Sequence, residues 1–416
     1  MTQPLPEIHT FGCRLNIAES ETMQRNAAAA GLDDIVIVNT CAVTAEAERQ
    51  AGQAIRRLKR EQPNARIVVT GCASHIDPQK YVAMPEIAHI IANDAKLNPE
   101  SFTALRAPTA KADPLILPAM PTPQTAPLQR AFIQVQNGCD HRCTFCIIPY
   151  GRGASRSLTS EKVTAEIRAR VEEGFNEIVL TGVDITSYGQ DLPAKPTLGA
   201  MIRKTLAAVP NLRRLRLSSL DPAAIDEDLW HLIAHEPRLM PHLHLSLQAG
   251  DDMILKRMKR RHSRDDVFRL TDRARRLRPD IVFGADIIAG FPTETEAMFA
   301  NTHALVEQCG LTWLHVFPYS ARTGTPAAKM PQTHGSLRKE RAERLRLLGE
   351  KAALQHHHSL LGQTIEVLVE NNNIGCTPHF AKVKLQGAAR VGAIVEARCR
   401  AIEENKPIAE VTGAAA

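Results

Sequence analysis

The stretch GCDHRCTFC, residues 138–146, places three cysteines at a C-x3-C-x2-C spacing directly after the apolar run AFIQVQ. Three thiolates this close can hold three corners of an iron–sulfur cube, which leaves the fourth iron without a protein ligand. Such an iron can bind a small molecule and pass an electron to it. The alternatives are buried thiols, a disulfide, or a structural zinc with His141 as its fourth ligand. The spacing favours an iron–sulfur cluster on Cys139, Cys143 and Cys146.

Length, composition and cysteine usage are those of a multidomain enzyme of a reducing compartment. The chain has 416 residues, of which 44% are hydrophobic, and a formal net charge of +6. That length predicts roughly two to four domains, and the mild positive charge permits a nucleic-acid partner without requiring one. The nine cysteines are an odd number, and the opening MTQPLPEIHT has neither the charge nor the apolar stretch of a secretory signal. With no run of roughly 18 apolar residues, we expect a cytoplasmic protein with reduced thiols and no membrane partner.

In the N-terminal region, three segments share one pattern, a short β-branched run that ends in cysteine. They are EIHTFGC, DIVIVNTC and RIVVTGC, which end at Cys13, Cys41 and Cys72. Helical stretches separate them, and this alternation predicts parallel βαβ units. Parallel strands point the same way, so their three cysteines should meet at the sheet edge where open α/β sheets bind ligands. One such cysteine could be structural, but three in the same topological position favour a second cluster with one open iron.

Six strand-like runs follow between Phe132 and Phe317, namely FIQVQ, EIVLT, RLRLS, HLHLSL, IVFGADII and WLHVF. Charged, helical stretches separate most of them, which predicts a partial or open (β/α) barrel with its active-site loops at the carboxyl ends of the strands. Small and polar residues stand at those ends, where glycine permits close approach of a ligand and polar groups fix its orientation. Each single residue is explained equally well by a turn or a strand cap. The candidate ligand-contacting residues are Gly182, Asp184, Ser218, Gln248, Asp286, Gly290 and Tyr319.

The segment LKRMKRRHSR, which follows the fourth run, concentrates positive charge on the loop side of the predicted barrel. A solvated helix face and contact with nucleic-acid phosphates explain such a run about equally well. The candidate RNA-contacting residues are Lys256, Arg257, Lys259, Arg260 and Arg261.

The remaining segments set the domain boundaries. Residues 107–129 are rich in proline and threonine and predict a linker. A long charged helix, LRKERAERLRLLGEKAALQ, precedes short runs separated by glycine and asparagine, which predict a small all-β domain. The histidines His356–His358 between them are interpreted as a solvated helix end. We therefore expect an α/β protein with a parallel α/β domain at 1–106, a barrel at 130–358 and a β domain at 359–416.

Eight motifs occur in the order in which one enzyme family has them: TFGCRLNIAESE, VNTCAVT, VTGCAS, GCDHRCTFCIIPYGRGASRS, EIVLTGVDI, HLHLSLQAGDD, DIIAGFPTETE and HVFPYSARTGTPA. Together they resemble the methylthiotransferase family of radical S-adenosylmethionine (SAM) enzymes over essentially the whole chain. NTCAVT with AERQAGQAIRR, and YSARTGTPAAKM, most resemble the branch that acts on threonylcarbamoyladenosine in tRNA. Two places depart from the family: Ala249-Gly250-Asp251 stands where Ser-Gly-Ser is common, and Ala289 where valine is frequent.

The resemblance implies a role for each part of the chain. The barrel cysteines would bind a [4Fe–4S] cluster whose open iron holds the methionine part of SAM. Phe145 would lie near the adenine, the turn Gly182–Asp184 at the methionine amino group, and Gly290 near the adenine or ribose. The same SAM pocket would include Ser218, Gln248 and Tyr319. The N-terminal cysteines would bind a second [4Fe–4S] cluster, and the β domain resembles the family's RNA-binding barrel, called TRAM.

The resemblance also implies a reaction, that of a transferase. The reduced barrel cluster would cleave SAM to a 5′-deoxyadenosyl radical that activates an aromatic C–H bond. The N-terminal cluster would hold or donate sulfur, and a second SAM would supply the methyl group. The product would be the 2-methylthio derivative of N6-threonylcarbamoyladenosine beside the tRNA anticodon, made on a base flipped into the pocket. An electron donor such as a flavodoxin or ferredoxin, and a sulfur source, are the further partners.

Other activities are compatible with parts of the pattern. One is methylthiolation of isopentenyladenosine in tRNA or of a ribosomal-protein side chain. The basic residues of the C-terminal segment favour RNA over a ribosomal protein. Another is a non-enzymatic iron–sulfur protein that binds RNA, which would leave the SAM-like motifs at the strand ends without a purpose.

Overall fold

The structure, a computed structural model, describes residues 6–106, 129–371 and 373–414. The linker predicted at 107–129 therefore lies outside the described residues, apart from Gln129. The described chain divides into two compact units.

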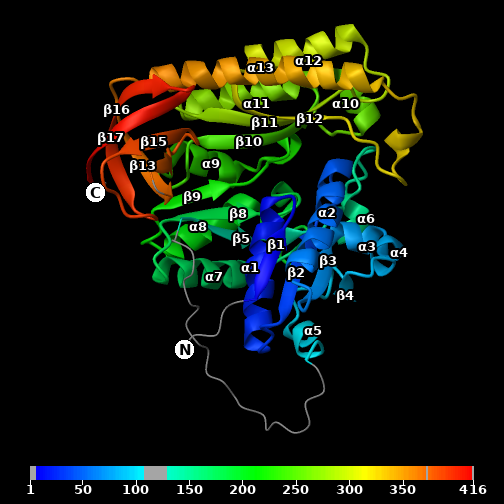
Figure 1. The fold of residues 1–416 in the computed structure, drawn as a ribbon. Coiled ribbons are helices and arrows are strands. Elements are labelled where there is room, and N and C mark those ends of the chain that lie inside the picture. The colour runs from blue at the N-terminus through cyan, green and yellow to red at the C-terminus, as the bar shows by residue number, and fades with distance from the viewer. Residues whose placement is uncertain (1–5, 107–128, 372, 415–416) are drawn as a thin grey trace. The chain divides into compact units, whose positions relative to one another are not determined.

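The N-terminal unit is built on a four-stranded parallel sheet with the strand order β1-β2-β3-β4 (Figure 1). Besides the described residues up to Arg106, it contains Gly138–His141 and Cys146–Ala154. The strands are β1 Glu7–Thr10, β2 Ile35–Thr40, β3 Arg66–Gly71 and β4 Ile87–Ile90. The helices are α1 Arg14–Ala29, α2 Ala45–Glu61, α3 Cys72–Ile76, α4 Pro78–Val82, α5 Pro99–Thr103 and α6 Ile148–Arg152. The parallel α/β architecture expected for this region is thus confirmed.

Both faces of this sheet are covered, because alternate residues of a strand point to opposite sides. Val38 of β2 belongs to the same apolar cluster as Ile55 of α2. Its neighbour Ile37 belongs to the opposite cluster, with Met23 of α1. Every residue of β2 is buried. That is why the strand reads as a continuous apolar run in the sequence instead of alternating with polar residues.

The barrel unit contains the remaining described residues and has six parallel strands in two ladders, β5-β8-β9 and β10-β11-β12. The strands are β5 Ala131–Gln134, β8 Glu177–Thr181, β9 Arg214–Leu217, β10 His242–Gln248, β11 Val282–Ala289 and β12 Leu311–Pro318. Single bridges, Leu215 to Leu239 and Leu220 to Leu245, join the two ladders. Among the described strands no ladder joins β5 to β12, so this is an open (β/α) barrel, as the sequence predicts.

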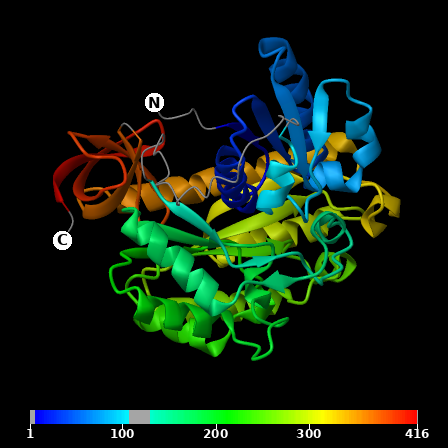
Figure 2. The same ribbon diagram turned by 90° about the horizontal axis from the view of Figure 1, so that it is seen from below.

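Helices cover the outer side of these strands (Figure 2). They are α7 Ser160–Glu172, α8 Leu198–Ala208, α9 Glu227–His235, α11 Arg264–Leu277, α12 Glu296–Gln308 and α13 Gly335–Ser359. The helix α10 Asp252–Met258 packs instead on an apolar cluster at the ends of the strands. The short elements are β6 Gln136–Asn137, β7 Arg156–Ser157, and the 3-10 turns η1 Ile185–Ser187, η2 Pro222–Ala224 and η3 Pro326–Lys329. One apolar cluster connects the strands to the helices and includes Ile133 of β5, Ile167 of α7 and Ile202 of α8.

The C-terminal strands form a closed barrel in the order β13-β14-β15-β17-β16. They are β13 Thr364–Asn371, β14 Ile374–Cys376, β15 Lys382–Gln386, β16 Ile394–Glu403 and β17 Lys406–Ala414. Val367 and Val383 lie in its core, while Lys382 and Lys384 on either side of Val383 are exposed. The alternation in KVKLQ therefore reports a half-buried strand, and the predicted small all-β domain is confirmed.

A buried group of charged side chains joins the small barrel to the larger one within this unit. Glu177 at the start of β8 is fully buried, and its carboxylate lies 3.2 Å from Nε of both Arg130 and Arg216. Burial opposes ionisation of Glu177, but Arg216 and Arg130 outweigh it and hold the pKa of this carboxyl below its usual value. Arg216 also donates to the carbonyl of Pro378 at 3.1 Å and lies over the ring of Phe380. The carboxylate of Glu177 thus holds in place the arginines that connect the small C-terminal barrel to the larger one.

Substitution of Glu177 by glutamine should lower the free energy of unfolding of the barrel unit by about 3–5 kcal/mol, because it leaves the buried guanidinium of Arg216 without its counter-charge. Urea denaturation followed by tryptophan fluorescence measures this change. Glu161→Gln is the matched control, since Glu161 makes an exposed pair with Lys204. That control should leave the transition midpoint unchanged. Equal midpoints for both variants would show that Glu177 does not organise the junction.

The interpretation of His356–His358 as a solvated helix end is wrong for two of the three histidines. His357 is buried, and its ring centroid lies 5.6 Å from that of Trp313 on β12. His356 lies 5.4 Å from the same ring, and burial lowers its pKa to about 4. The reason is that α13 packs along β12 and brings its last turn against Trp313. Only His358 is exposed, as predicted.

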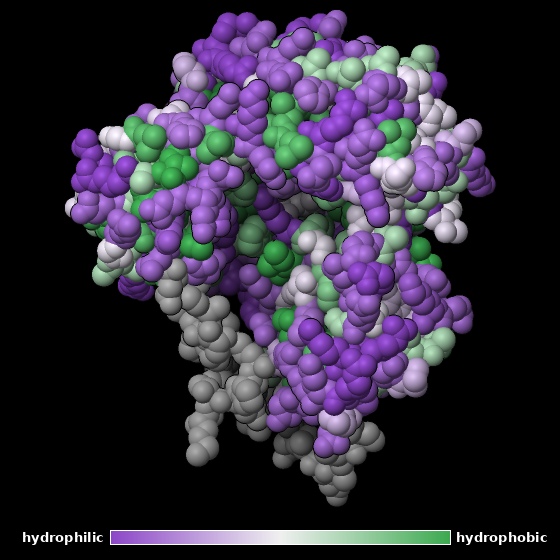
Figure 3. All heavy atoms as spheres, turned by 45° about the horizontal axis from the view of Figure 1, so that its top comes forward, coloured by the Kyte–Doolittle hydropathy of each residue, from purple (hydrophilic) through white to green (hydrophobic). Residues whose placement is uncertain are grey.

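No helix in the described ranges is long and apolar enough to cross a membrane. On the face drawn in Figure 3, hydrophobic side chains are scattered among hydrophilic ones.

Candidate functional site

The structure places Cys13, Cys41 and Cys72 after adjacent parallel strands. Cys41 and Cys72 directly follow β2 and β3, and Cys13 follows β1 after Phe11 and Gly12. Gly12 has a φ of +96°, and a Cβ at this position would lie 2.4 Å from Sγ of Cys41. Only glycine lets the turn between β1 and α1 come this close to the thiol.

The three thiols lie near one another at this edge. The pKa of Cys41 is raised to about 11, mainly by burial, and the neighbouring thiols of Cys13 and Cys72 contribute to this rise. Like charges affect one another's titration in this way only at short range. All three cysteines are free. Because a metal ligand must be a thiolate, binding of iron here would release protons.

A buried network of charged side chains adjoins the thiols. Arg152 of α6 donates to the two carboxylate oxygens of Glu19 at 2.7 and 3.0 Å. Lys96 Nζ lies 2.6 Å from the same carboxylate, and both Glu19 and Lys96 are 1% exposed. Burial opposes ionisation of Glu19, but Arg152 and Lys96 outweigh it and lower its pKa. Two cations and one carboxylate give this network one net positive charge.

This positive charge suits an anionic centre. Burial raises the pKa of Cys72, whereas Arg152 and Lys96 act to lower it. Asn93 Nδ2 lies 3.9 Å from Cys72 Sγ and donates to the carbonyl of Gly151 at 2.6 Å, which fixes the amide. Converging thiols, a cationic surrounding and an N–H donor to sulfur form a set that fits an iron–sulfur cluster.

The second cysteine set lies in the loop of residues 138–146. Its three cysteines are free thiols of intermediate exposure. Within the barrel unit, the N–H of Thr144 donates to Met258 O at 3.1 Å, and the Thr144 carbonyl accepts from Ala327 N at 2.9 Å. The neighbouring Phe145 packs on an apolar cluster at the ends of the strands. The middle of the loop is therefore fixed, and reachable thiols on a fixed loop suit a cluster that must admit a small molecule.

The turn after β8 is held from beneath by a glutamine. Gln136 Oε1 accepts from the N–H groups of Val183 and Asp184 at 3.0 and 2.9 Å. A Cβ on Gly182 would lie 2.7 Å from the carbonyl of Gln136, so glycine is needed for this approach. The Asp184 carboxylate accepts hydrogen bonds from the hydroxyls of Thr186 and Ser187, both at 2.6 Å. The turn Gly182–Asp184, which is predicted to contact SAM, is thus fixed by hydrogen bonds to Gln136 and to these two hydroxyls.

The other SAM candidates differ in what surrounds them. Gly290 N–H donates to Glu294 Oε2 at 2.9 Å, and a Cβ there would lie 2.5 Å from Cγ of Arg338, so this glycine serves packing against α13. Tyr319 is buried and packs edge-on against Phe291. Gly290 and Tyr319 are therefore both engaged in packing, which limits the atoms that either residue can offer to a ligand.

Ser218 and Gln248 are better placed for a ligand. The Ser218 hydroxyl is buried and has no hydrogen-bond partner among the described residues. Gln248 ends β10 with a φ of +70°, a left-handed conformation that is strained for a residue with a side chain. A buried polar atom without a partner and a strained strand end are both frequent where a ligand completes a site.

The basic run is divided between surface and interior. Lys256 is exposed, and so is Lys259, whose φ of +57° turns the chain at the end of α10. Arg260 consequently points inward: its side chain is 8% exposed, donates to Ser246 O at 2.7 Å and lies 3.6 Å from Cys143 Sγ. Little of the Arg260 side chain is thus exposed for the RNA contact predicted for it. The residue instead places a positive charge beside a barrel cysteine.

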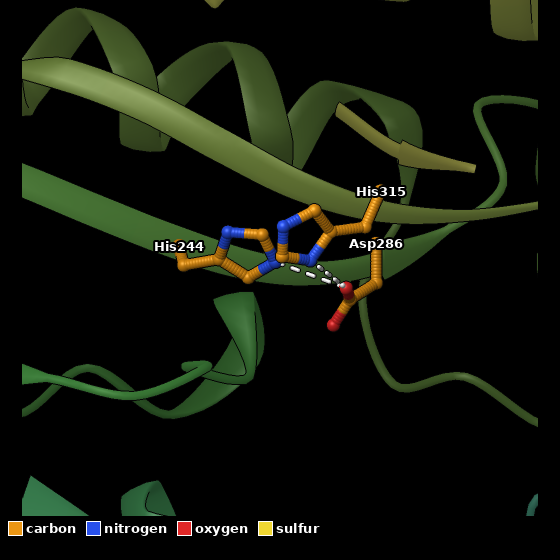
Figure 4. Close-up of side chains that lie close together, drawn as sticks. All are labelled: His244, Asp286 and His315. Atoms are coloured by element: carbon orange, nitrogen blue, oxygen red, sulfur yellow. Dashed lines mark hydrogen bonds and ion pairs between the residues drawn. The ribbon is translucent and has the colours of Figure 1, made fainter. Parts of the chain in front are cut away.

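Two histidines and an aspartate meet on β10, β11 and β12 (Figure 4). His244 Nε2 and His315 Nδ1 lie 3.0 and 3.2 Å from the same oxygen of Asp286. Burial opposes ionisation of Asp286, but the hydrogen bonds from both imidazoles outweigh it and hold its pKa well below the usual range. The side-chain nitrogen and oxygen atoms of these three residues that could bind a metal lie within 4.8 Å of one another. In the described chain, the sulfur atoms of neither cysteine set all lie within this distance. A cube spreads its thiolates over different irons, so it needs the wider spacing.

Comparison with known proteins identifies the family. Residues 133–306 match the Radical SAM superfamily, and residues 6–92 match a family described as uncharacterized protein family UPF0004. The threonylcarbamoyladenosine tRNA methylthiotransferase MtaB of Rickettsia prowazekii is 50% identical over 96% of this chain and 95% of its own length. This chain belongs to the MtaB family of radical SAM methylthiotransferases. It is a transferase that uses SAM and a [4Fe–4S] cluster.

Other relatives set the MtaB family in a wider group. The MtaB protein of Aquifex aeolicus is 31% identical over 93% of this chain and 98% of its own length. A tRNA-2-methylthio-N(6)-dimethylallyladenosine synthase of Cereibacter sphaeroides is 33% identical, over 98% of both chains. Among solved structures, the radical SAM methyltransferase TsrM of Kitasatospora setae aligns with a TM-score of 0.51 and 17% identity, over 76% of this chain and 68% of that one. This last likeness supports the radical SAM fold.

Several residues of this MtaB-family chain were not found by sequence analysis. Glu19, Lys96 and Arg152 lie far apart in the sequence and meet only through the fold. Gln136 stands inside a quoted apolar run and shows no local signal of its role. A buried charge is visible in a sequence only when its partner lies at a regular spacing, which none of these has.

Proposed function

We propose that the protein converts N6-threonylcarbamoyladenosine next to the anticodon of tRNA to its 2-methylthio derivative. The observation that carries this proposal is the 50% identity, over nearly the whole chain, to a relative named for that substrate. The identity to the dimethylallyladenosine enzyme is much lower, at 33%. Because the MtaB protein of Aquifex aeolicus is only 31% identical, the choice of base rests on the Rickettsia prowazekii relative.

The chain carries two sets of three cysteine ligands, and we assign one [4Fe–4S] cluster to each. The N-terminal set is Cys13, Cys41 and Cys72, and the barrel set is Cys139, Cys143 and Cys146. Cys139, Cys143 and Cys146 would hold the barrel cluster, which together with SAM would supply the radical chemistry needed at the adenine ring. Arg152 and Lys96 neutralise charge at the N-terminal set. Arg260 does so beside Cys143.

The SAM pocket is assigned to the carboxyl ends of the barrel strands, where Ser218 and Gln248 are the strongest candidates. Gln136 acts as a positioning residue, because it holds the turn that contains Asp184. Phe145, Gly182, Gly290 and Tyr319 complete the proposed pocket.

The domains proposed are an N-terminal methylthiotransferase domain at 1–106, a SAM barrel at 130–358 and a TRAM-like RNA-binding domain at 359–416. The partners proposed are tRNA, a small electron-transfer protein of the flavodoxin or ferredoxin type, and a sulfur source, all in the cytoplasm. Lys256 and Lys259 are the exposed basic residues near the barrel loops that suit tRNA phosphates. Arg257 and Arg261 are partly engaged, the first with Thr293 and the second with Asp221.

Anaerobically reconstituted protein, incubated with SAM, a reductant and tRNA that carries threonylcarbamoyladenosine, should add a methylthio group to that nucleoside. Mass spectrometry of the digested tRNA measures the product. A parallel reaction with tRNA that carries isopentenyladenosine is the control. Modification of the control tRNA alone would replace the proposed substrate, and modification of neither would reject a tRNA substrate.

A further inference from the structure

A hollow lies between the exposed face of α2 and Phe11, close to the sheet edge that carries Cys13, Cys41 and Cys72. The hollow has a volume of about 580 Å3 and is lined by Phe11 and, on α2, by Gln50, Gln53, Arg56, Arg57 and Arg60. The helix residues recur at intervals of three and four, so they form one continuous stripe. The opposite side of α2 carries the apolar residues that pack on the sheet.

The three arginines of this stripe are exposed and hardly neutralised. Arg57 has Glu61 at 3.8 Å, and both side chains are more than half exposed, so the attraction between them is weak. The side chains of Arg56 and Arg60 make no ion pair or hydrogen bond with any other described residue. Glu46, in the first turn of α2, forms its ion pair with Arg49 and not with an arginine of this stripe. The stripe therefore presents a strong positive charge to solvent.

Phe11 connects this hollow to the cysteines. Its N–H is bonded to Asn39 O at 3.0 Å, and its partly buried ring packs on the apolar cluster that contains Cys72. Gly12 and Cys13 follow directly. A partly exposed aromatic ring can stack on a nucleobase, and the glutamine amides beside it can bond to base edges.

We propose that this face of α2 docks the anticodon stem–loop of tRNA, with phosphates on Arg56, Arg57 and Arg60 and an unpaired base on Phe11. The proposal rests on the proposed tRNA substrate and assigns it a contact surface on the N-terminal unit. Guanidinium groups pair well with phosphate oxygens, and an aromatic ring among them is typical of surfaces that bind single-stranded RNA. The surface adjoins the cysteine edge, so RNA bound there lies beside the proposed sulfur-carrying cluster. An acidic electron-transfer protein could pair with the arginines, but its binding would not require the Phe11 ring or the amides of Gln50 and Gln53.

The test compares tRNA affinity across a salt series for wild type and for Arg56→Ala/Arg57→Ala/Arg60→Ala. Affinity of the variant should fall, and the log–log salt slope should decrease by roughly 0.7 to 0.9 for every phosphate that the variant no longer neutralises. Phe11→Leu should weaken binding about fivefold or more at an unchanged slope, because leucine keeps the packing but not the stacking. Iron content and melting temperature of each variant, equal to wild type, exclude misfolding as the cause.

The matched control removes three positive charges elsewhere, with Arg168→Ala/Arg203→Ala/Lys204→Ala on the exposed faces of α7 and α8. Its salt slope should equal that of wild type. An unchanged affinity and slope in the α2 variant, with wild type binding tRNA normally, would overturn the docking surface and leave the proposed function intact. A variant that binds tRNA normally but reacts slowly with a flavodoxin, and normally with dithionite, would assign the surface to the electron donor instead. Failure of wild type to bind tRNA would reject the proposed function itself.

Discussion

Replacement of Cys13, Cys41 and Cys72 by alanine should abolish formation of the methylthio nucleoside while cleavage of SAM to 5′-deoxyadenosine continues. The three side chains are the only protein ligands assigned to one cluster, whereas the barrel loop holds its own set. Iron should fall from about eight to about four atoms per chain, because one of two cubes is removed. Chromatography of the small-molecule products, mass spectrometry of the tRNA and an iron assay measure the three effects.

The reciprocal variant, with alanine at Cys139, Cys143 and Cys146, should lose both reactions and retain about four irons. This pair of variants separates the two roles within one protein. If the N-terminal triple variant still modified tRNA at the wild-type rate, its cysteines would be structural. Zinc in place of iron, with no visible charge-transfer absorption, would contradict the assignment of either cluster.

Substitution of Glu19 by glutamine should lower the free energy of unfolding of the N-terminal unit by about 3–5 kcal/mol, because Arg152 and Lys96 would remain buried without their counter-charge. Hydrogen–deuterium exchange with mass spectrometry resolves this unit, since peptides from β1, β2 and β3 should lose protection. The N-terminal cluster should disappear with it, while that of the barrel loop remains.

Glu46→Gln is the matched control, because Glu46 makes an exposed pair with Arg49 in the same unit. It should change neither exchange nor iron content. If Glu19→Gln kept its exchange protection but lost the cluster, the role of the Glu19, Lys96 and Arg152 network would be to set the charge beside the thiols, and it would not stabilise the fold.

The sequence predicted those parts of the fold that depend on local pattern. The β-branched runs before Cys41 and Cys72 are complete strands, and because the strands are parallel neighbours, the predicted meeting of their cysteines followed from topology alone. The barrel strands and the small C-terminal all-β domain were likewise predicted from their short apolar runs, whereas closure of the latter into a barrel was implied only by the family resemblance. The KVKLQ strand shows the same regularity in the structure, with Val383 inside and Lys384 outside.

The direction of single side chains could not be predicted in the same way. Arg260 belongs to a basic run and has the composition of a surface residue, but the left-handed turn at Lys259 sends it inward. His356 and His357 end a charged helix, but that helix passes over Trp313. Both outcomes depend on which residue the tertiary fold places opposite, and no local spacing encodes that.

The N-terminal ligands come from three different strand ends, whereas the barrel ligands share one short loop. This difference fixes an order of maturation. The loop can collect its ligands at a small loop-closure cost while the rest of the chain is still folding. The N-terminal set comes together only after β1, β2 and β3 have paired, so the cluster proposed for it would have to follow folding of this sheet. Once bound, the cluster proposed there would tie three strand ends together like a cross-link and so stabilise the folded N-terminal unit.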